Sequence, residues 1–316
     1  MTLWDDAQIR WLFGGMAAIL TVATVIGQII RLRKGRGKVV DNLNQRIWAW
    51  WGMIFIIFLA LFIGNIGTVV LFGIISFLAL REFISLIPTR LADHRTLFWA
   101  FFIITPLQYY FVATQWYGMM SIFIPVYAFI FVAIRGVLGG DATEYLARTS
   151  KIQWALMVCV FALSHIPALL MLSLSGGPAQ NFKLILFILT VVQISDILQY
   201  CFGKLFGKHL VAPKISPNKT VEGLVGGILS ASLVGILLSP ITPFSWWQSG
   251  IISLLLTSLG FFGGVVMSAI KRDQGVKDFG SALPGHGGIL DRVDSLCFSA
   301  PVFFHIVRYF FDVSPN

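Results

Sequence analysis

The sequence predicts an all-α, polytopic membrane protein. Of its 316 residues, 57% are apolar and only 12% are charged, with a mean hydropathy of +0.83. Soluble globular chains carry about 25% charged residues, so this chain lies far outside their range. Apolar runs long enough to cross a bilayer as helices recur along its whole length. Helices are expected because lipid offers no hydrogen-bond partner to an open backbone.

About ten transmembrane helices are expected, one for each apolar run. The runs cover residues 11–30, 47–64, 66–87, 97–114, 117–134, 152–172, 182–202, 221–239, 248–270 and 293–311. The first run is not a cleaved signal, because Asp5 and Asp6 precede it and no small-residue cleavage site follows. Only residues 65–67 separate the second run from the third. Without a repeat or a low-complexity tail, residues 1–316 are expected to form a single membrane domain.

The distribution of basic residues predicts that both termini lie outside the cytoplasm. In that orientation the loops at 31–46, 81–96, 135–151, 203–220 and 271–292 are cytoplasmic, and they hold 20 of the 23 lysines and arginines. Only Arg10, Lys183 and Arg308 remain on the other side, as the positive-inside rule requires. The net charge of +9 therefore belongs to loops beside anionic lipid and gives no reason to invoke nucleic acid.

The segment 31–38 is the densest run of positive charge. It is interpreted as a determinant of topology, and the alternative is that it recruits an anionic lipid substrate. The cysteines, Cys159, Cys201 and Cys297, are odd in number and widely spaced. They predict neither a disulfide framework nor a zinc site.

Asp196 is the most informative acidic residue, because it stands inside an apolar run. A carboxylate at the centre of a span costs roughly 2.5 to 3.5 kcal/mol, so such a residue usually faces a polar cavity or a charged partner. A functional role in a polar site is one interpretation. The other is a structural ion pair with Lys271 or Lys204.

Asp291 and Asp294 stand where the last helix should begin, and their i, i+3 spacing places them on one face about a turn apart. Two like charges there repel unless a cation holds them. Oxygen ligands suit Mg²⁺, and no cluster of histidine and cysteine is available for zinc. The alternative is a helix start that is salt-bridged by Arg292.

A glycine-rich turn, 285–288, precedes this helix and includes His286. Its glycines can bring backbone N–H groups close to an anion. Basic side chains just upstream are suited to phosphate oxygens: Lys271, Arg272 and Lys277. Together these are the parts of a site for phosphate and metal.

A second polar stretch, 202–223, has the same character. Ser216 and Pro217 are interpreted as a helix N-cap followed by proline at the first helical position. Lys219 and Thr220 would then lie in the first turn, where free N–H groups favour phosphate. The stretch is not a Walker loop, because the glycine-rich lead and the Gly-Lys-Ser/Thr ending are absent.

These residues closely resemble the phosphatidate cytidylyltransferase family, the CDP-diacylglycerol synthases. The family signature is matched, with its spacing, by Ser268, Lys271, Arg272, Lys277, Asp278, Pro284, His286, Gly287, Gly288, Asp291, Arg292 and Asp294. Upstream the matches are Asp196, Tyr200, Gly203, Lys204, Gly207, Lys208, Ser216, Pro217, Lys219, Thr220 and Gly223. The resemblance is specific over about the last third of the chain, and the signature is concentrated in 190–296.

The resemblance implies transfer of a cytidylyl group from CTP to phosphatidate or a closely related lipid phosphate, forming CDP-diacylglycerol and pyrophosphate. It implies Mg²⁺, allows a second, monovalent cation such as K⁺, and suggests a homodimer in the inner (cytoplasmic) membrane with its site facing the cytoplasm. The implied catalytic residues are Asp291, Asp294, Asp278, Lys277 and His286, and the implied metal ligands are Asp196, Asp291 and Asp294. The implied substrate-binding residues are Lys208, Ser216, Lys219, Thr220, Lys271, Arg272 and Arg292.

One departure from the family pattern concerns the helix that leads to Lys271. The family usually carries a Gly-Asp pair and a Glu-Ser pair there, whereas this sequence has Gly263-Gly264 and Met267-Ser268. One expected metal ligand is therefore absent at Gly264. The chain resembles a divergent paralogue, and the alternative function is a catalytically weak or inactive protein with a lipid-binding or regulatory role. Transport is a further alternative, but the charges gather at predicted helix ends and not at the midplane that carriers use.

Overall fold

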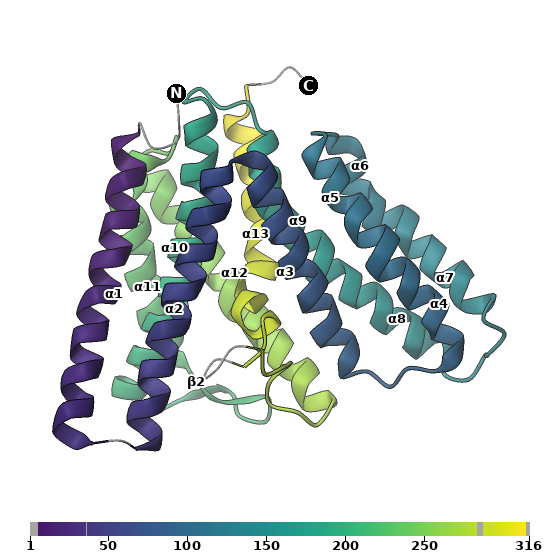
Figure 1. The fold of residues 1–316 in the computed structure, drawn as a ribbon, viewed down its shortest axis with the longest axis horizontal. Helices are drawn as coiled ribbons and strands as arrows, with labels where there is room; N and C mark the ends of the chain where they lie inside the picture. Colours follow the sequence, from purple (N-terminus) through teal and green to yellow (C-terminus); the bar gives the residue numbers. More distant parts are fainter. Residues whose placement is uncertain (1–5, 36, 283–286, 314–316) are drawn as a thin grey trace.

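The computed structural model describes residues 6–35, 37–282 and 287–313. Long helices dominate it and run between two ends of the molecule (Figure 1). The predicted all-α class is confirmed, with one small addition. A two-stranded antiparallel hairpin, β1 and β2, joins two of the helices.

The helices and strands follow the predicted order of apolar runs. The first part of the chain forms α1 (Ala7–Lys34), α2 (Lys38–Ile63), α3 (Asn65–Ser85), η2 (Leu91–Asp93), α4 (His94–Trp99), η3 (Ala100–Ile104), α5 (Thr105–Ala113), α6 (Tyr117–Ile122), η4 (Phe123–Ala128) and α7 (Phe129–Val137). The rest forms α8 (Tyr145–Leu156), η5 (Met157–Ala162), α9 (Leu163–Ala168), η6 (Leu169–Met171), α10 (Pro178–Phe206), β1 (Leu210–Ala212), β2 (Ser216–Thr220), α11 (Val221–Leu237), η7 (Ser239–Ile241), α12 (Trp246–Asp273) and α13 (Leu290–Phe311).

Eight helical segments of the described residues are long and apolar enough to cross a membrane. They are Ala7–Arg33, Val39–Ile63, Asn65–Ser85, Leu91–Ala113, Tyr117–Val137, Tyr145–Met171, Pro178–Phe206 and Trp246–Asp273. The other two of the ten predicted spans also fall on helices. One is α11, which is apolar but has only 17 residues, and the other is α13, which begins with the charged residues of the signature.

The sequence predicts a break at 65–67, and the structure has it one residue earlier, at Gly64, with Asn65 as the first residue of α3. Gly64 has φ 91°, a left-handed conformation that glycine adopts without the steric cost of a side chain. Its N–H closes α2 by donating to the carbonyls of Ala60 and Leu61 at 3.2 and 3.1 Å. The long apolar stretch is therefore two helices and not one.

The four last helices form the part of the bundle that carries the signature residues. Helix α10 packs against α11, and α12 packs against both α11 and α13. Helix α3 contacts α13 and α9, while α1 and α2 pack against each other on one flank (Figure 1). In this view α1 begins and α13 ends at the upper end, whereas the hairpin and the segment after α12 lie at the lower end.

Close approach of α10 and α11 depends on glycines. A Cβ added at Gly223 would lie 2.7 Å from the carbonyl oxygen of Gln199, and one at Gly227 would lie 2.7 Å from the Cα of Gln199. Both contacts are shorter than real Cβ atoms allow. Small residues let membrane helices approach in this way, and here they bring the N-terminus of α11 next to the part of α10 that holds Asp196.

The predicted start of α11 at Ser216 and Pro217 is wrong. Residues Ser216–Thr220 form β2, and the helix begins at Val221 with Thr220 as its N-cap. The hydroxyl of Thr220 accepts the N–H of Gly223 at 3.1 Å. Threonine is a good N-cap, and proline is tolerated in a short strand that has an unpaired edge, so local chemistry permits the observed arrangement as well as the predicted one.

Candidate functional site

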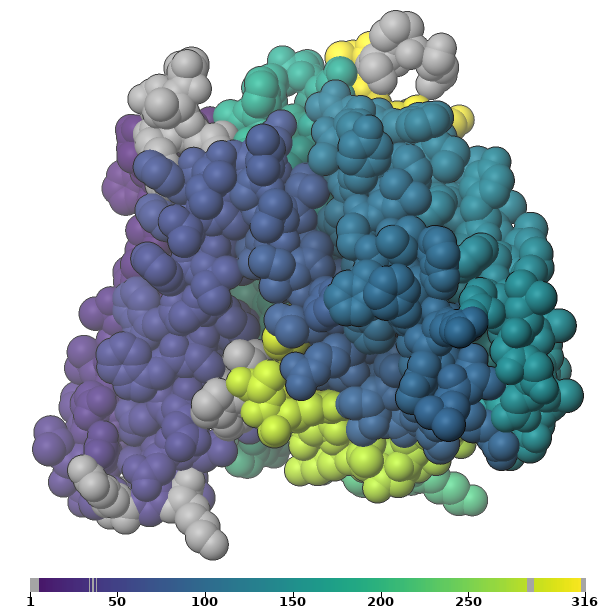
Figure 2. Space-filling model, turned by 45° about the vertical axis from the view of Figure 1, so that its right-hand side comes forward, coloured from purple at the N-terminus to yellow at the C-terminus, as the bar shows by residue number. Residues whose placement is uncertain are grey.

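The three predicted metal-binding aspartates lie where α10, α12 and α13 pack together, and the hairpin and the segment after α12 mark the lower end of the bundle near them (Figure 1). Asp196 lies in α10, and Asp291 and Asp294 lie in the first turns of α13. The segment that joins α12 to α13 reaches the surface at this end, where Figure 2 shows it in yellow-green beside the blue helices. Asp291 is buried and Asp196 and Asp294 are half-buried, so the acids lie inside the bundle beside this segment.

Asp291 is held by three hydrogen bonds and is 7% exposed. The ammonium of Lys271 donates to its Oδ1 at 2.8 Å. The backbone N–H groups of Phe279 and Gly288 donate to its Oδ2 at 2.8 and 3.0 Å. The sequence left open whether this helix start binds a cation or is salt-bridged by Arg292. Asp291 is salt-bridged, but its partner is Lys271 and not Arg292.

Asp196 and Asp294 share one hydroxyl group. Ser295 Oγ lies 2.9 Å from Asp196 Oδ2 and 3.4 Å from Asp294 Oδ1, and the N–H of Ser295 donates to the same oxygen of Asp294 at 2.7 Å. A hydroxyl has one proton, so it cannot donate to both carboxylates at once. The pair therefore concentrates negative charge that one serine cannot satisfy. Among the described residues, Asp196 forms no ion pair with Lys271 or Lys204.

Lys219 supplies a positive charge that faces both acids of this pair, and Lys271 and Arg292 add positive charge nearby. Its ammonium donates to the carbonyl of Phe261 at 3.2 Å and lies 4.5 Å from the centre of that ring. Burial lowers the pKa of Lys219, and the carboxylates of Asp196 and Asp294 act in the opposite direction. The lysine thus reaches from β2 toward Asp196 and Asp294, which together with Ser295 form what is called the acidic cluster below.

Gly264 provides the room for that ammonium. A Cβ at this position would lie 2.7 Å from Lys219 Nζ and 3.8 Å from Ser295 Oγ. Any side chain at 264 would therefore have to displace the lysine. The position at which the family pattern expects an aspartate borders the same cluster as Asp196 and Asp294.

The donors fit a magnesium ion only in part. Carboxylate oxygens of Asp196 and Asp294 are suitable ligands and are close together, but Asp291 already has three partners. Among the described residues, no group of three or more histidine, cysteine, aspartate and glutamate side chains is arranged to hold a metal. A metal bound here would complete its coordination with water or phosphate oxygens.

The predicted phosphate-binding residues lie in different environments. Arg292 has a buried Nε without a hydrogen-bond partner among the described residues, so it can still donate. Arg272 is committed to backbone carbonyls, those of Ile215 at 3.3 Å and Val276 at 2.9 Å. Lys208 is exposed, and its backbone N–H donates to Glu222 at 2.9 Å.

The remaining predicted residues are more peripheral. Ser216 pairs with Ala212 in the hairpin, and Thr220 caps α11. Lys277 and Asp278 are exposed in the segment after α12. A Cβ at Gly287 would lie 3.4 Å from the Cβ of Asp278, so that residue borders the turn. His286 lies outside the described residues.

Some participants were not predicted from the sequence. Ser295, which links Asp196 to Asp294, follows the signature directly, but serine has no distinctive spacing. Phe279 contributes its N–H to Asp291, and its ring lies 5.2 Å from Lys271 Nζ. Gln193 donates to the carbonyl of Arg292 at 3.0 Å. No local pattern marks these residues, because each acts through a partner far away in the chain.

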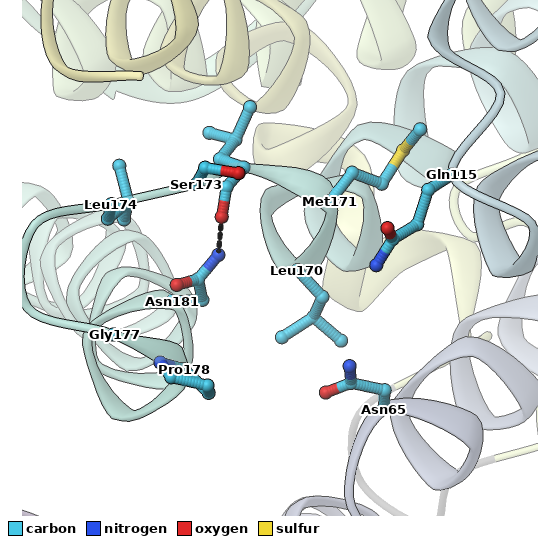
Figure 3. A pocket seen from close by; sticks show the side chains of 10 residues that line it. Asn65, Gln115, Leu170, Met171, Ser173, Leu174, Gly177, Pro178 and Asn181 are labelled. Carbon is cyan, nitrogen blue, oxygen red and sulfur yellow. Dashed lines mark hydrogen bonds between the residues drawn. The ribbon is translucent and has the colours of Figure 1, made fainter. Parts of the chain in front are cut away.

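A separate pocket of about 310 Å³ lies at the opposite end of the bundle, near the starts of α3 and α10. Figure 3 shows Asn65, Gln115 and Met171 around it, with Asn181 donating to a backbone carbonyl. Its lining residues are all uncharged. It therefore offers no lysine, arginine or carboxylate side chain, and the acidic cluster is the better candidate site.

Comparison with known proteins adds independent information. The model of the family described as "Cytidylyltransferase family" matches residues 44–310. A protein of Escherichia coli (strain K12), named "Uncharacterized protein YnbB", is 41% identical over 298 residues, which cover 92% of this chain and 96% of the relative.

Relatives with a named activity match a shorter segment. A phosphatidate cytidylyltransferase of Staphylococcus saprophyticus is 45% identical over 126 residues, or 39% of this chain and 48% of the relative. One of Staphylococcus aureus (strain COL) is 42% identical over 127 residues, with the same coverage of 39% and 48%. The match spans about half the length of these relatives.

Proposed function

The chain belongs to the cytidylyltransferase family, and we propose that it transfers a cytidylyl group from CTP to phosphatidate or a closely related lipid phosphate. The products would be CDP-diacylglycerol and pyrophosphate. The observation that carries the proposal is the cluster of Asp196, Asp294 and Lys219 at one end of a membrane bundle. It combines oxygen ligands for a cation with a half-buried positive charge for phosphate.

The reaction is a displacement at phosphorus. An oxygen of the lipid phosphate attacks the α-phosphorus of CTP, the bond from that phosphorus to the bridging oxygen breaks, and pyrophosphate leaves with the electron pair. Such a reaction needs no covalent nucleophile from the protein. It depends on orientation of the two phosphates and neutralisation of their charge.

Each part of the site has a role in this proposal. Asp196 and Asp294 would hold Mg²⁺, which neutralises charge on the nucleotide phosphates. Lys219 and Arg292 would donate to phosphate oxygens, because Lys219 faces the acids and Arg292 has a free buried donor. Asp291 would keep Lys271 and the turn at Gly288 in place. Lys277, Asp278 and His286 remain predicted contributors from the segment before α13.

The membrane setting is part of the proposal. The cluster adjoins β2, and the hairpin and the basic segments lie at one end of the bundle, which we place at the cytoplasmic face of the inner membrane, where CTP is available. The lipid acceptor would approach from the adjacent leaflet. K⁺ as a second cation and a homodimer remain expectations from the resemblance.

The direct test is incubation of the purified protein with CTP, Mg²⁺ and phosphatidate. We expect formation of CDP-diacylglycerol and pyrophosphate in equal amounts, and loss of both products when EDTA removes the divalent cation. Lipid phosphates with other backbones should be assayed in parallel. A folded protein that forms no CDP-linked lipid from any of these acceptors would contradict the proposal.

The second candidate, a catalytically weak or inactive paralogue, is favoured by the glycine at 264, where Lys219 Nζ occupies the space that a side chain would need. Gly264→Asp tests it. The ammonium is the far end of a flexible side chain, so it can move aside, and the new carboxylate would add a charged ligand beside Asp196 and Asp294. We expect the Mg²⁺ concentration for half-maximal rate to fall by about threefold or more, because fewer carboxylates weaken binding of this ion.

Gly264→Ala is the matched control, since it displaces the ammonium without adding charge. Initial rates are titrated with Mg²⁺ in both variants after each is shown to be folded. If the aspartate variant is active and its midpoint equals that of the alanine variant, the metal does not lie beside residue 264.

A further inference from the structure

The start of α13 is capped by a residue from a distant helix. The N–H of Ile289 donates to Glu82 Oε1 at 2.9 Å, and the N–H of Leu290 donates to Glu82 Oε2 at 2.8 Å. Glu82 lies in the last turn of α3, more than 200 residues earlier in the chain. The two oxygens of one carboxylate thus satisfy two of the N–H groups that every helix leaves unpaired at its start.

Among the described residues, no side chain next to the start of α13 caps that helix. Its N-cap residue is Ile289, whose side chain cannot accept a hydrogen bond, and no side-chain cap bond is formed by it. A carboxylate is the most favourable group for this position, because the helix dipole makes the N-terminus positive and charge-assisted hydrogen bonds are the strong ones. Glu82 therefore supplies what the local sequence of α13 lacks.

The position of Glu82 does not benefit its own helix. A negative charge in the last turn of α3 meets the negative end of that helix dipole. Among the described residues Glu82 forms no ion pair with lysine or arginine. Its carboxylate accepts hydrogen bonds from the start of α13, which points to a tertiary role.

The surrounding chain is shaped to admit the carboxylate. A Cβ at Gly280 would lie 2.7 Å from Glu82 Oε1, and a Cβ at Gly288 would lie closer still to Oε2. The neighbouring Phe83 stacks on Phe279 with ring centres 5.9 Å apart and planes 18° apart. Since the N–H of Phe279 binds Asp291, the end of α3 supports both the segment before α13 and the first turn of α13.

We propose that Glu82 is a positioning residue: by capping α13 from α3, its carboxylate sets where Asp291 and Asp294 stand relative to α10 and α12. It touches no reacting atom. Asp294 lies one turn beyond the capped N–H groups, so a shift at the start of α13 moves this carboxylate relative to Asp196 and Ser295. The part of this inference that concerns turnover rests on the proposed function, whereas the capping does not.

The test replaces Glu82 by glutamine, which has nearly the same shape but only one acceptor oxygen and no charge. Hydrogen exchange at the amides of Ile289 and Leu290 is followed by mass spectrometry on overlapping peptides, in the full-length protein in detergent. We expect exchange at these amides to accelerate by about tenfold or more, because a charge-assisted pair is replaced by at most one neutral bond. The matched control is Glu144→Gln, an exposed glutamate at the start of α8 whose side chain makes no cap bond.

Steady-state kinetics give the second readout. We expect kcat of Glu82→Gln to fall by about tenfold to a hundredfold, with KM for CTP within about threefold of wild type, because small displacements of catalytic groups cost orders of magnitude in rate. A purely structural role would lower the amount of folded protein and leave kcat per folded molecule unchanged. Glu82→Asp, which keeps the charge but is one methylene shorter, should be intermediate in both measurements and serves as the test variant if the glutamine protein does not fold.

The outcomes separate the two parts of the account. If both amides in the glutamine variant exchange hydrogen at the wild-type rate, the capping role is overturned. Faster exchange with unchanged kcat would overturn the positioning role. If the wild-type protein itself transfers no cytidylyl group, the proposed function fails, and the exchange measurement still decides whether Glu82 holds α13.

Discussion

Replacing Asp294 by asparagine is expected to lower kcat by about a thousandfold, or ~4 kcal/mol in the activation barrier, while the protein stays folded. The reason is the position of this carboxylate. It shares the hydroxyl of Ser295 with Asp196 and faces the half-buried ammonium of Lys219, but among the described residues it forms no ion pair that holds the helices together. Asparagine keeps its shape and its bond from the N–H of Ser295 while removing the charge.

The measurement compares kcat and unfolding temperature for Asp294→Asn, with Asp273→Asn as the control. Asp273 is an exposed acid at the end of α12 whose side chain accepts from Gln274, so its loss should change neither quantity. An Asp294→Asn protein that keeps more than about a tenth of the wild-type rate, a change of under about 1.4 kcal/mol in the barrier, would exclude Asp294 as a ligand or charge-stabilising group.

Replacing Lys271 by methionine is expected to destabilise the protein by about 3 to 5 kcal/mol. Asp291 is 3% exposed in its side chain and Lys271 is 11% exposed, and their charged atoms lie 2.8 Å apart. Without the lysine, a carboxylate remains buried with only two backbone N–H groups as partners. Asp291→Asn should also destabilise the protein, because it leaves the ammonium of Lys271 buried without its carboxylate partner. Asp294→Asn, by contrast, should leave the protein folded.

The test is a double-mutant cycle on unfolding in detergent, with Lys214→Met, an exposed lysine of the hairpin turn, as the control. The double variant Lys271→Met/Asp291→Asn should be more stable than the sum of the single losses implies, because neither change then leaves a buried charge unpaired. Strictly additive losses would show that the two residues do not act as a pair.

The overall architecture follows from the sequence because hydropathy acts over whole helices. Each of the ten predicted apolar runs falls on a helical segment, and the break between α2 and α3 lies at Gly64. The predicted start of α11 failed for a local reason. Ser216 and Pro217 suit a helix start, but Thr220 suits it as well, and pairing of β2 with β1 decides between them.

The candidate site was predictable as a set of residues and not as an arrangement. The i, i+3 spacing of Asp291 and Asp294 places both on one face of α13, yet the structure gives them different partners: Lys271 for one and Ser295 for the other. The absence of an acid at Gly264 is visible in the sequence. That Lys219 fills the space beside it is not, because the two residues approach only when β2 packs against α12.

Glu82 shows the limit of such reasoning most clearly. In the sequence it is one acid near the end of a predicted span, with no spacing that relates it to the signature. Its role depends on two N–H groups more than 200 residues away and on glycines that leave room for its carboxylate. Only the packing of α3 against α13 brings these groups together.

The central claim is that the acidic cluster transfers the nucleotidyl part of CTP to a lipid phosphate. It is tested most directly by supplying CTP labelled either at the α-phosphate or at the γ-phosphate, with phosphatidate and Mg²⁺, to the wild-type protein and to Asp294→Asn. The account predicts that α-label enters the lipid fraction, that γ-label is released as pyrophosphate, and that both processes nearly vanish in the variant. Transfer of γ-label to the lipid would instead identify a kinase. A lipid fraction that stays unlabelled with both labelled forms of CTP would contradict the account.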